Sequence, residues 1–511
     1  MAKWDTGYVS NINYTSGYYA ELNPIQGNLA RLLKGYRVTG AKNACELGFG
    51  NGLSAIIHSA ASSARWYGND FNPSQASLAA EIVEDAGCDA NLCDDSFEEY
   101  LSRKDLPKFE FIGLHGIWSW VSRQNQKLVI QFIKKNLAVG GTLYISYNTL
   151  PGWSQFSPIR ELMMERLRTG GYSEGDIKER VENAFSFAKE IIDAGSVYSN
   201  SNPTVKKQID EFSSQSIQYL AHEFFNKDWS PVHFKTLALD MERAKLTYAA
   251  PAHLGEHIDH LNFTHEQRQT LAGIKDKYLN ESVRDFFLNQ TFRRDYWIKG
   301  PNRLTSQEQL DLFRSLRISF LSHKEDVQLN FTGPLGVINL LQKVYEPLLD
   351  VLSENHVIDV RTVEKKVEKL GIDLAQLFEA LTILSAKGYV RPVQNEHEID
   401  LAISKTKKLN RTLLQKSKYS SEVKFLASPL TGGGLQVSRF TQLFMLAKQQ
   451  GAKTPEEFSR FAWECLRKEN SKLIKDGKSL NTEEENLDEL QTQATSFRDK
   501  MIPLLERALI L

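Results

Sequence analysis

The chain has 511 residues, with 62 lysines and arginines against 63 aspartates and glutamates and a net charge near −1. This balance excludes the overall basic excess of a protein whose main partner is nucleic acid. With 41% hydrophobic and 10% aromatic residues, the chain can bury large cores, which excludes wholesale disorder. At roughly 100 to 200 residues per domain, the length predicts about three domains.

The number of cysteines and the length of the apolar runs indicate in which cellular compartment the protein works. The four cysteines are too few and too irregularly spaced for a disulfide framework or a metal knuckle. Residues 1–14 are polar where a secretory signal needs an apolar run, and no stretch approaches the roughly 18 apolar residues of a membrane span. We therefore expect a cytoplasmic protein without a membrane span.

Residues 43–150 alternate short apolar runs with amphipathic stretches, which is the pattern of a parallel sheet with crossover helices. Helices are expected at 74–86 and at 126–137, the latter ended by Gly140 and Gly141. The region is therefore predicted to be α/β. The expected strands are Asn43–Leu47, Arg65–Asn69, Ala90–Cys93, Phe109–Leu114 and 142–147.

The pattern changes after Trp153 to long helical periodicities, from 159 to about 218, which predict a helical insertion. A strand at 223–226, a helix at 233–244 and a strand at 246–250 are then expected to complete the sheet. The first domain is accordingly predicted to span 1–253, with the insertion at about 155–220.

Three further regions are expected after this domain. Residues 254–335 have helical, polar-faced patterns and predict a helical middle domain. Residues 336–395 have three short helical patterns and a final strand, which is the order of a winged helix, and 396–511 are expected to be mostly helical. The predicted recognition helix, 373–386, has no lysine or arginine, so we expect no nucleic-acid partner for this module.

The strongest local signal is an apolar strand that leads into Gly48, Gly50 and Gly52 and then into a helix. Glycines at such a turn allow positive φ and let backbone amides approach a ligand at a helix N-terminus. Glu46 stands two residues before the first glycine. A dinucleotide-binding fingerprint would need a third glycine at position 53, where this chain has Leu53.

Two further turns strengthen this signal. Asp70, followed by Phe71, ends the next strand, where an acid bonds ribose hydroxyls in nucleotide-binding sheets. The pattern of Glu46 and the three glycines resembles the cofactor loop of class I S-adenosylmethionine methyltransferases. In that family an acid and a polar turn after the third strand recognise adenine, and Asp95, Ser96 and Phe97 fit that position.

The fourth and fifth strands lead into polar and aromatic turns at the same edge of the sheet. His115 is expected near the cofactor, with a structural hydrogen bond as its alternative role. Tyr147 and Asn148 are the substrate-side candidates, and with His115 they form the candidate catalytic set. The tyrosines of an N-terminal arm either close over this site or simply pack; these are Tyr14, Tyr18 and Tyr19.

Longer segments resemble bacterial methyltransferases that carry a methyltransferase regulatory domain, in particular the rickettsial protein lysine methyltransferases that act on outer-membrane proteins. The segments are 14–24 (YTSGYYAELNP), 115–121 (HGIWSWV), 146–153 (SYNTLPGW), 219–226 (YLAHEFFN) and 284–295 (RDFFLNQTFRRD). The resemblance implies S-adenosyl-L-methionine as cofactor and a homodimer. The helical stretch 159–218 is the candidate dimerisation element.

The predicted function is therefore S-adenosylmethionine-dependent methylation, with lysine side chains of proteins as the predicted acceptors. The alternative is an O- or N-methyltransferase of a small molecule or surface glycan, since the same sheet serves all of these reactions. A third hypothesis is a module that only senses the cofactor. No metal is expected, because a solvated helix face also explains the spacing of His253, His257 and His260.

Overall fold

The computed structural model describes residues 17–169 and 177–511. Its N-terminal part is built on one sheet, whose strands are β1 (Asn43–Leu47), β2 (Arg65–Asn69), β3 (Ala90–Cys93), β4 (Phe109–Leu114), β5 (Leu137–Asn148), β6 (Leu246–Pro251) and β7 (Phe292–Lys299). Their order is β3-β2-β1-β4-β5-β7-β6. Strands β1 to β5 run parallel, and β7 is antiparallel to both of its neighbours.

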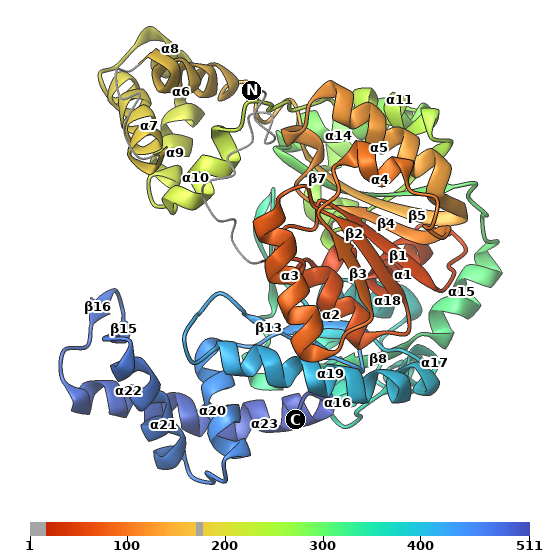
Figure 1. Ribbon diagram of the computed structural model, residues 1–511. Coiled ribbons are helices and arrows are strands. Elements are labelled where there is room, and N and C mark those ends of the chain that lie inside the picture. The colour runs from red at the N-terminus through yellow and green to blue at the C-terminus, as the bar shows by residue number, and fades with distance from the viewer. Residues whose placement is uncertain (1–16, 170–176) are drawn as a thin grey trace.

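Helices cover both faces of this sheet (Figure 1). They are η1 (Ala20–Leu22), α1 (Pro24–Leu33), α2 (Leu53–Ala61), α3 (Pro73–Ala86), α4 (Phe97–Ser102), η2 (Trp118–Trp120), α5 (Arg123–Asn136) and α11 (Phe234–Arg243). Successive side chains of a strand point to opposite faces. Leu143 and Ile145 therefore pack against α4, α5 and α11, whereas Tyr144 packs on the face that α1 and α2 cover.

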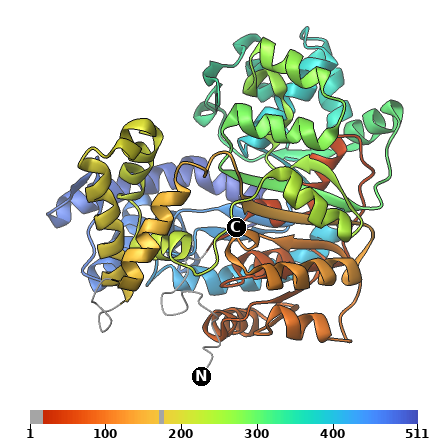
Figure 2. The ribbon, with the colours of Figure 1, turned by 90° about the horizontal axis from the view of Figure 1, so that it is seen from above.

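A group of helices follows β5 and forms a lobe set apart from the sheet (Figures 1 and 2). These helices are α6 (Ser157–Thr169), α7 (Ile177–Asp193), α8 (Val197–Ser201), α9 (Pro203–Phe212) and α10 (Ile217–Phe224). The lobe has a hydrophobic core of its own around Phe156, Met163 and Phe224. The insertion therefore has a packed core that does not depend on the core of the sheet.

The seventh strand corrects the predicted boundary at residue 253. Strand β7 lies beyond that boundary and pairs with β5 on one side and β6 on the other. Its charged run resembles a solvated segment in the sequence, yet Arg293 and Asp295 are only 6% and 1% exposed. Ion pairs with each other and with Glu281 and Asp285 make this burial possible, because a buried charge needs a partner.

Two smaller predictions are also wrong: the strand at 223–226, and the end of the helix 126–137 at Gly140 and Gly141; the helix itself is present as α5. The strand expected at 223–226 is absent, since Glu223 and Phe224 end helix α10 and a turn follows. The helix expected at 126–137 ends at Asn136, and β5 begins at Leu137. Gly140 and Gly141 therefore lie inside β5, and Gly141 begins its continuously buried part.

Helices connect β6 to β7: η3 (Leu254–His257), α12 (Asp259–Asn262), α13 (His265–Gly273) and α14 (Lys277–Leu288). The elements after β7 are α15 (Ser306–Ser315), β8 (Arg317–Phe320), η4 (Lys324–Asp326), β9 (Asn330–Gly333), β10 (Gly336–Asn339), α16 (Gln342–Ser353), β11 (Ile358–Asp359), α17 (Val360–Glu368), α18 (Leu374–Ala386) and β12 (Val390–Pro392). Segment 254–335 thus contains strands as well as helices.

The winged-helix-like unit begins before residue 336. Its three-stranded sheet has the order β11-β8-β12, and β8 belongs to the preceding segment. Helix α18, the predicted recognition helix, buries Leu377, Leu381 and Leu384 in the core of this unit. It also packs against η3 of the first domain, so it faces protein.

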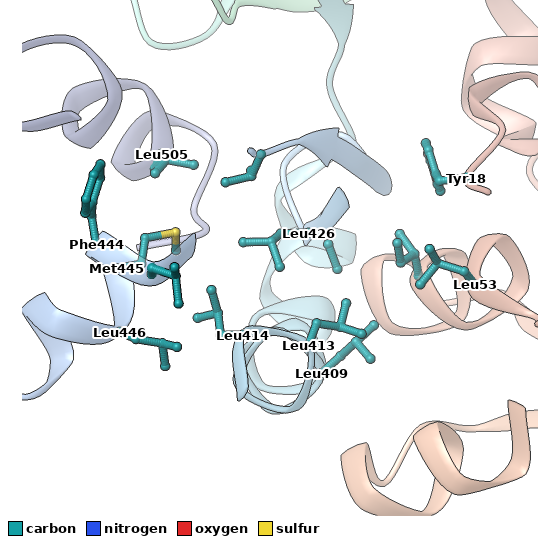
Figure 3. Packing of buried hydrophobic residues seen from close by; sticks show 14 of the residues in the cluster. Tyr18, Leu53, Leu409, Leu413, Leu414, Leu426, Phe444, Met445, Leu446 and Leu505 are labelled. Atoms are coloured by element: carbon teal, nitrogen blue, oxygen red, sulfur yellow. The ribbon is translucent and has the colours of Figure 1, made fainter. Parts of the chain in front are cut away.

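The C-terminal elements are α19 (Glu396–Lys416), β13 (Phe425–Ser428), β14 (Gly433–Gln436), α20 (Arg439–Gln449), α21 (Pro455–Lys468), β15 (Ile474–Lys475), β16 (Lys478–Ser479), α22 (Glu483–Ser496), η5 (Phe497–Met501) and α23 (Ile502–Arg507). Figure 3 shows α19 between the sheet domain and α20: Leu409 and Leu413 lie toward Leu53 of α2, and Leu414 lies toward Met445. This shared core joins the two ends of the chain. In residues 17–169 and 177–511, no helix has the length and apolar content of a membrane span.

Candidate active site

A cavity of about 550 Å³ opens at the carboxyl ends of β1, β2, β4 and β5 and extends to the helical insertion. The sheet side and the N-terminal arm contribute Gly17, Tyr19, Glu46, Gly48, Phe49, Gly50, Asn51, Asn69, Asp70, Phe71, Gln75, Phe97, His115, Gly116, Ile117, Trp120, Val121, Asn148, Thr291 and Phe292. The insertion and the turns at its two ends contribute Trp153, Gln208, Glu211, Phe212, Gln218, Tyr219, His222, Glu223 and Asn226.

The glycine loop forms the floor of this cavity. Gly48, Gly50 and Gly52 have φ of 71°, 58° and 71°, a region that favours glycine. A Cβ atom at Gly48 would lie 2.3 Å from Cδ1 of Ile117, so a side chain there would displace Ile117 as well as strain the backbone. Gly48 and Gly50 line the cavity, whereas Gly52 lies behind them as the N-cap of α2. The loop therefore presents backbone to whatever binds.

Two buried acids flank the loop. The Oε2 atom of Glu46 has no hydrogen-bond partner among the described residues, and burial, with the charge of Asp70 adding to it, raises the pKa of Glu46 to about 8. The carboxylate of Asp70 is held by the backbone N–H groups of Gly50 and Asn72, at 2.8 and 3.0 Å. Burial raises the pKa of Asp70 to about 6. Both acids line the cavity and can accept hydrogen bonds from a ligand.

Only one of the three residues predicted to contact adenine lines the cavity. Phe97 does so, as does Phe71 after β2. Ser96 caps α4 by accepting a hydrogen bond from the Glu99 N–H at 3.3 Å. Asp95 forms an ion pair with Arg103 at 3.4 Å. Neither Asp95 nor Ser96 belongs to the cavity lining, because these local contacts direct both side chains elsewhere.

His115 lies at the cavity wall under the N-terminal arm. Its ring stacks on Tyr19 at a centroid distance of 3.5 Å, and its Nδ1 lies 2.8 Å from the hydroxyl of Tyr144. Burial lowers the pKa of His115 to about 4, so the imidazole is neutral near pH 7. A neutral, hydrogen-bonded and stacked ring is suited to shaping the wall of a binding site.

The arm tyrosines divide between two roles. Tyr19 lines the cavity, whereas Tyr18 hydrogen-bonds to His58 at 3.0 Å and accepts the N–H of Gly434 at 2.7 Å. Tyr18 therefore ties the arm to the C-terminal hairpin. Tyr14 lies outside the described residues.

The structure places the two candidates on β5 in different surroundings. Tyr147 is fully buried on the face that α5 and α11 cover, and its hydroxyl donates to Oδ2 of Asp295 at 2.7 Å. It does not line the cavity. Asn148, the next residue, points the opposite way into the cavity, and its Nδ2 donates to Oε1 of Glu223 at 3.3 Å. The substrate-side prediction for Tyr147 is therefore corrected, and Tyr147 belongs to the sheet core.

The insertion side of the cavity carries the residues that the sequence did not single out. Burial raises the pKa of Glu223 to about 7, and its backbone carbonyl accepts the indole N–H of Trp120 at 3.1 Å. Glu211 adds a second carboxylate, and Trp153, Phe212 and Tyr219 add aromatic surface. The motif 219–226 could have indicated these residues, but it was interpreted as a strand. In the structure it forms the end of helix α10, from which Glu223 lines the cavity.

The histidines at 253, 257 and 260 do not form one helix face. His253 precedes η3, His257 ends it, and His260 lies on α12. His257 is hydrogen-bonded to the carbonyl of Pro251 at 2.9 Å. Within the described part of the chain, no group of three or more histidine, cysteine, aspartate or glutamate side chains is arranged to hold a metal ion.

Comparison with known proteins identifies the family. Residues 216–299 match the family described as a predicted methyltransferase regulatory domain. An uncharacterized protein of Synechocystis sp. is 38% identical over 509 residues, which cover 99% of each chain. The chain belongs to the methyltransferase family that carries this regulatory domain. A second relative, an uncharacterized protein of Rickettsia prowazekii, is 22% identical over 97% of this chain and 94% of its own length.

A solved structure shares the fold of this methyltransferase family. PKMT2 from Rickettsia typhi, in complex with AdoHcy, matches with a TM-score of 0.68 at 18% identity, over 94% of this chain and 98% of that chain. A second structure of PKMT2 from Rickettsia typhi matches with a TM-score of 0.67. The predicted fold class, α/β with a class I methyltransferase sheet, is therefore confirmed.

Proposed function

We propose that this chain is an S-adenosylmethionine-dependent methyltransferase that N-methylates lysine side chains of protein substrates. One observation carries the proposal: a single cavity joins the glycine loop and its two acids to a wall of aromatic rings and carboxylates. The first half suits a cofactor with ribose and amino groups. The second half suits a cationic side chain.

The cofactor half fits S-adenosylmethionine on features of this chain. The unpartnered Oε2 of Glu46 can accept a hydrogen bond from an amino group, and the fixed carboxylate of Asp70 can accept from ribose hydroxyls. Gly48 and Gly50 leave space for close approach to the backbone. When bound, the cofactor supplies a methyl group on a positively charged sulfur. The AdoHcy bound by PKMT2 from Rickettsia typhi supports this assignment.

The substrate half fits an amine. Faces of aromatic rings attract cations, and Trp120, Trp153 and Tyr219 provide such surface. Glu223 and Glu211 add negative charge when ionised. Because Asn148 hydrogen-bonds to Glu223, the carboxylate is held at the junction of the two halves. A lysine side chain that enters from the insertion side would bring its nitrogen to this junction.

Glu223 also provides for the proton. Methyl transfer needs the lone pair of a neutral amine, and Glu223, whose pKa burial raises to about 7, is placed to accept the proton once enclosure in the site has lowered the pKa of the ammonium group toward the same range. The nitrogen lone pair then forms the new N–C bond as the C–S bond breaks, and the bonding pair stays on sulfur. The aromatic walls hold the amine in line for this displacement.

The test is incubation with radiolabelled S-adenosylmethionine and a bacterial lysate. We expect discrete labelled protein bands whose hydrolysate contains methyl-lysine, and Asp70→Ala should abolish them. Label confined to small molecules or glycans would replace the lysine assignment by the alternative substrate class. Absence of both AdoHcy binding and label would contradict the methyltransferase proposal itself.

We further propose that the helical insertion is a dimerisation element, as its projection from the body of the molecule suggests (Figure 1). Replacing residues 157–224 by a short linker should yield a monomer in light scattering. AdoHcy binding should persist, since the glycine loop and Asp70 remain. A variant that still dimerises would contradict this role.

A further inference from the structure

A second cavity, of about 270 Å³, lies between the end of α1, the β6–β7 pair and helix α14. Most of its lining comes from residues 248–293, inside the matched regulatory domain. Nothing in the proposed methyl-transfer reaction uses this space. Its chemistry can therefore be considered separately.

The start of β7 separates the two cavities. Thr291 and Phe292 line the first cavity, whereas Gln290 and Arg293 line the second. Neighbouring side chains of a strand point to opposite faces, so Phe292 and Arg293 diverge. The second cavity is therefore a distinct site on the other side of this segment.

Basic side chains dominate the lining of the second cavity. They are Lys34, Lys275, Lys277, Arg284, Arg293 and Arg303. The acidic side chains are Glu256, Glu281 and Asp285. Because basic groups are in excess, the chemistry of the cavity depends on which of them form no ion pair with an acid.

The acids are largely committed to two of the arginines. Arg293 binds Glu281 at 2.9 Å, Asp285 at 2.6 Å and Asp295 at 3.0 Å. Arg284 binds Asp259 at 2.9 Å. Burial raises the pKa of Glu256 to about 7, so this carboxyl carries only part of a negative charge at neutral pH. Glu281 and Asp285 are thus engaged with Arg293, and in the described part of the chain neither forms an ion pair with another basic group of the lining.

Four basic residues of the lining form no ion pair within 4.0 Å in the described ranges of the chain. They are Lys34, Lys275, Lys277 and Arg303. Arg303 donates to two neutral groups, the carbonyl of Lys34 at 2.9 Å and the hydroxyl of Tyr36 at 2.6 Å. Four cationic groups from three separate segments therefore meet around one cavity.

Like charges lie close together here. Burial lowers the pKa of Lys34, and the positive charge of Arg284 adds to this, while the charges of Asp259 and Glu281 act against it. Burial likewise lowers the pKa of Lys277; Arg303 adds to this effect and Glu281 acts against it. Gathering several cations around one concave space is unfavourable in the absence of a counter-charge. An anion in the cavity would relieve this repulsion and would receive several charge-assisted hydrogen bonds.

We propose that the second cavity is a binding site for a small anion that carries a phosphate or carboxylate group. Lys34, Lys275, Lys277 and Arg303 supply the charge. The rings of Tyr36 and Phe263 and the side chain of Asn262 complete the wall. The volume suits a compact metabolite and excludes a long polymer.

The experiment is calorimetric titration of the full chain with inorganic phosphate and, separately, with malonate, at constant ionic strength. We expect saturable binding of at least one anion. Lys34→Met and Lys277→Met should each weaken it at least about tenfold, since each removes one charged contact. Lys42→Met, at an exposed lysine outside the cavity, is the matched control and should bind as the wild type does.

Preference for phosphate or for malonate identifies the group that the site recognises. Binding of neither anion, or equal binding by wild type and Lys277→Met, would overturn the proposal. Lys277 is exposed on the first turn of α14, so its variant tests the site even where Lys34→Met fails to fold. A parallel AdoHcy titration separates this outcome from failure of the proposed methyltransferase function.

Discussion

The two halves of the first cavity are built in different ways. The cofactor half comes from short stretches of sequence, residues 46–52 and 70–71, in which backbone amides and glycines with positive φ form most of the surface. The substrate half is assembled from side chains far apart in the chain, such as Asn148 and Glu223, which are 75 positions apart. A local motif can specify the first half, whereas only the packing of the insertion against the sheet positions the second.

The largest expected effect is on the substrate half. Glu223→Gln removes the proton acceptor, so kcat should fall about 100-fold or more, while the Kd for AdoHcy stays unchanged. Steady-state kinetics and calorimetry measure the two quantities. Glu190→Gln, at an exposed position on α7 of the same insertion, is the control and should keep full activity. If Glu223→Gln also weakened AdoHcy binding about 100-fold, the two halves of the cavity would not act independently.

The next effect concerns the cofactor half. Asp70→Ala removes a fixed acceptor for two hydroxyls, which is expected to cost about 2 to 3 kcal/mol, or about 30- to 150-fold in AdoHcy affinity. Calorimetric titration measures this loss. Asp94→Ala, an exposed acid after β3, is the control and should bind normally. Unchanged affinity in Asp70→Ala would show that the ligand does not use this carboxylate.

A smaller effect tests the correction on β5. Tyr147→Phe leaves Oδ2 of Asp295 without one of its donors, so the free energy of unfolding should fall by about 1 to 2 kcal/mol. Turnover by the folded enzyme should stay near the wild-type value, because Tyr147 does not line the cavity. Urea denaturation and kinetics test this pair of outcomes. A large loss of turnover at normal stability would restore the catalytic role for Tyr147.

The smallest effect is a pH dependence. A carboxyl group is neutral below its pKa and anionic above it, so the active form of Glu223 increases as the pH rises through about 7. Raising the pH from 7 to 8 should therefore increase kcat by just under about twofold through this group. The substrate amine contributes its own rise, which Glu223→Gln retains. The ratio of wild-type kcat to Glu223→Gln kcat, plotted against pH, should therefore change slope near pH 7. A ratio that is constant with pH would contradict the role of Glu223.

The sequence by itself determined the first strands and the cofactor loop. Strands β1 to β4 have the predicted bounds, since each is a short apolar run between turns, and such a pattern depends on neighbouring residues alone. The places of Glu46, Gly48, Gly50 and Asp70 follow from the same local order, because the ends of parallel strands meet at one edge.

Tertiary structure alone decided the rest. Strand β7 carries charges that local patterns assign to solvent, and it can be buried only because Glu281 and Asp285 meet Arg293 there. Tyr147 is buried in the sheet core and Asn148 lines the cavity, and this difference depends on which face of β5 meets the cavity. Glu223 enters the site through the docking of α10, which no short stretch of sequence records. These features rest on contacts between distant residues, and their free energy exists only in the folded chain.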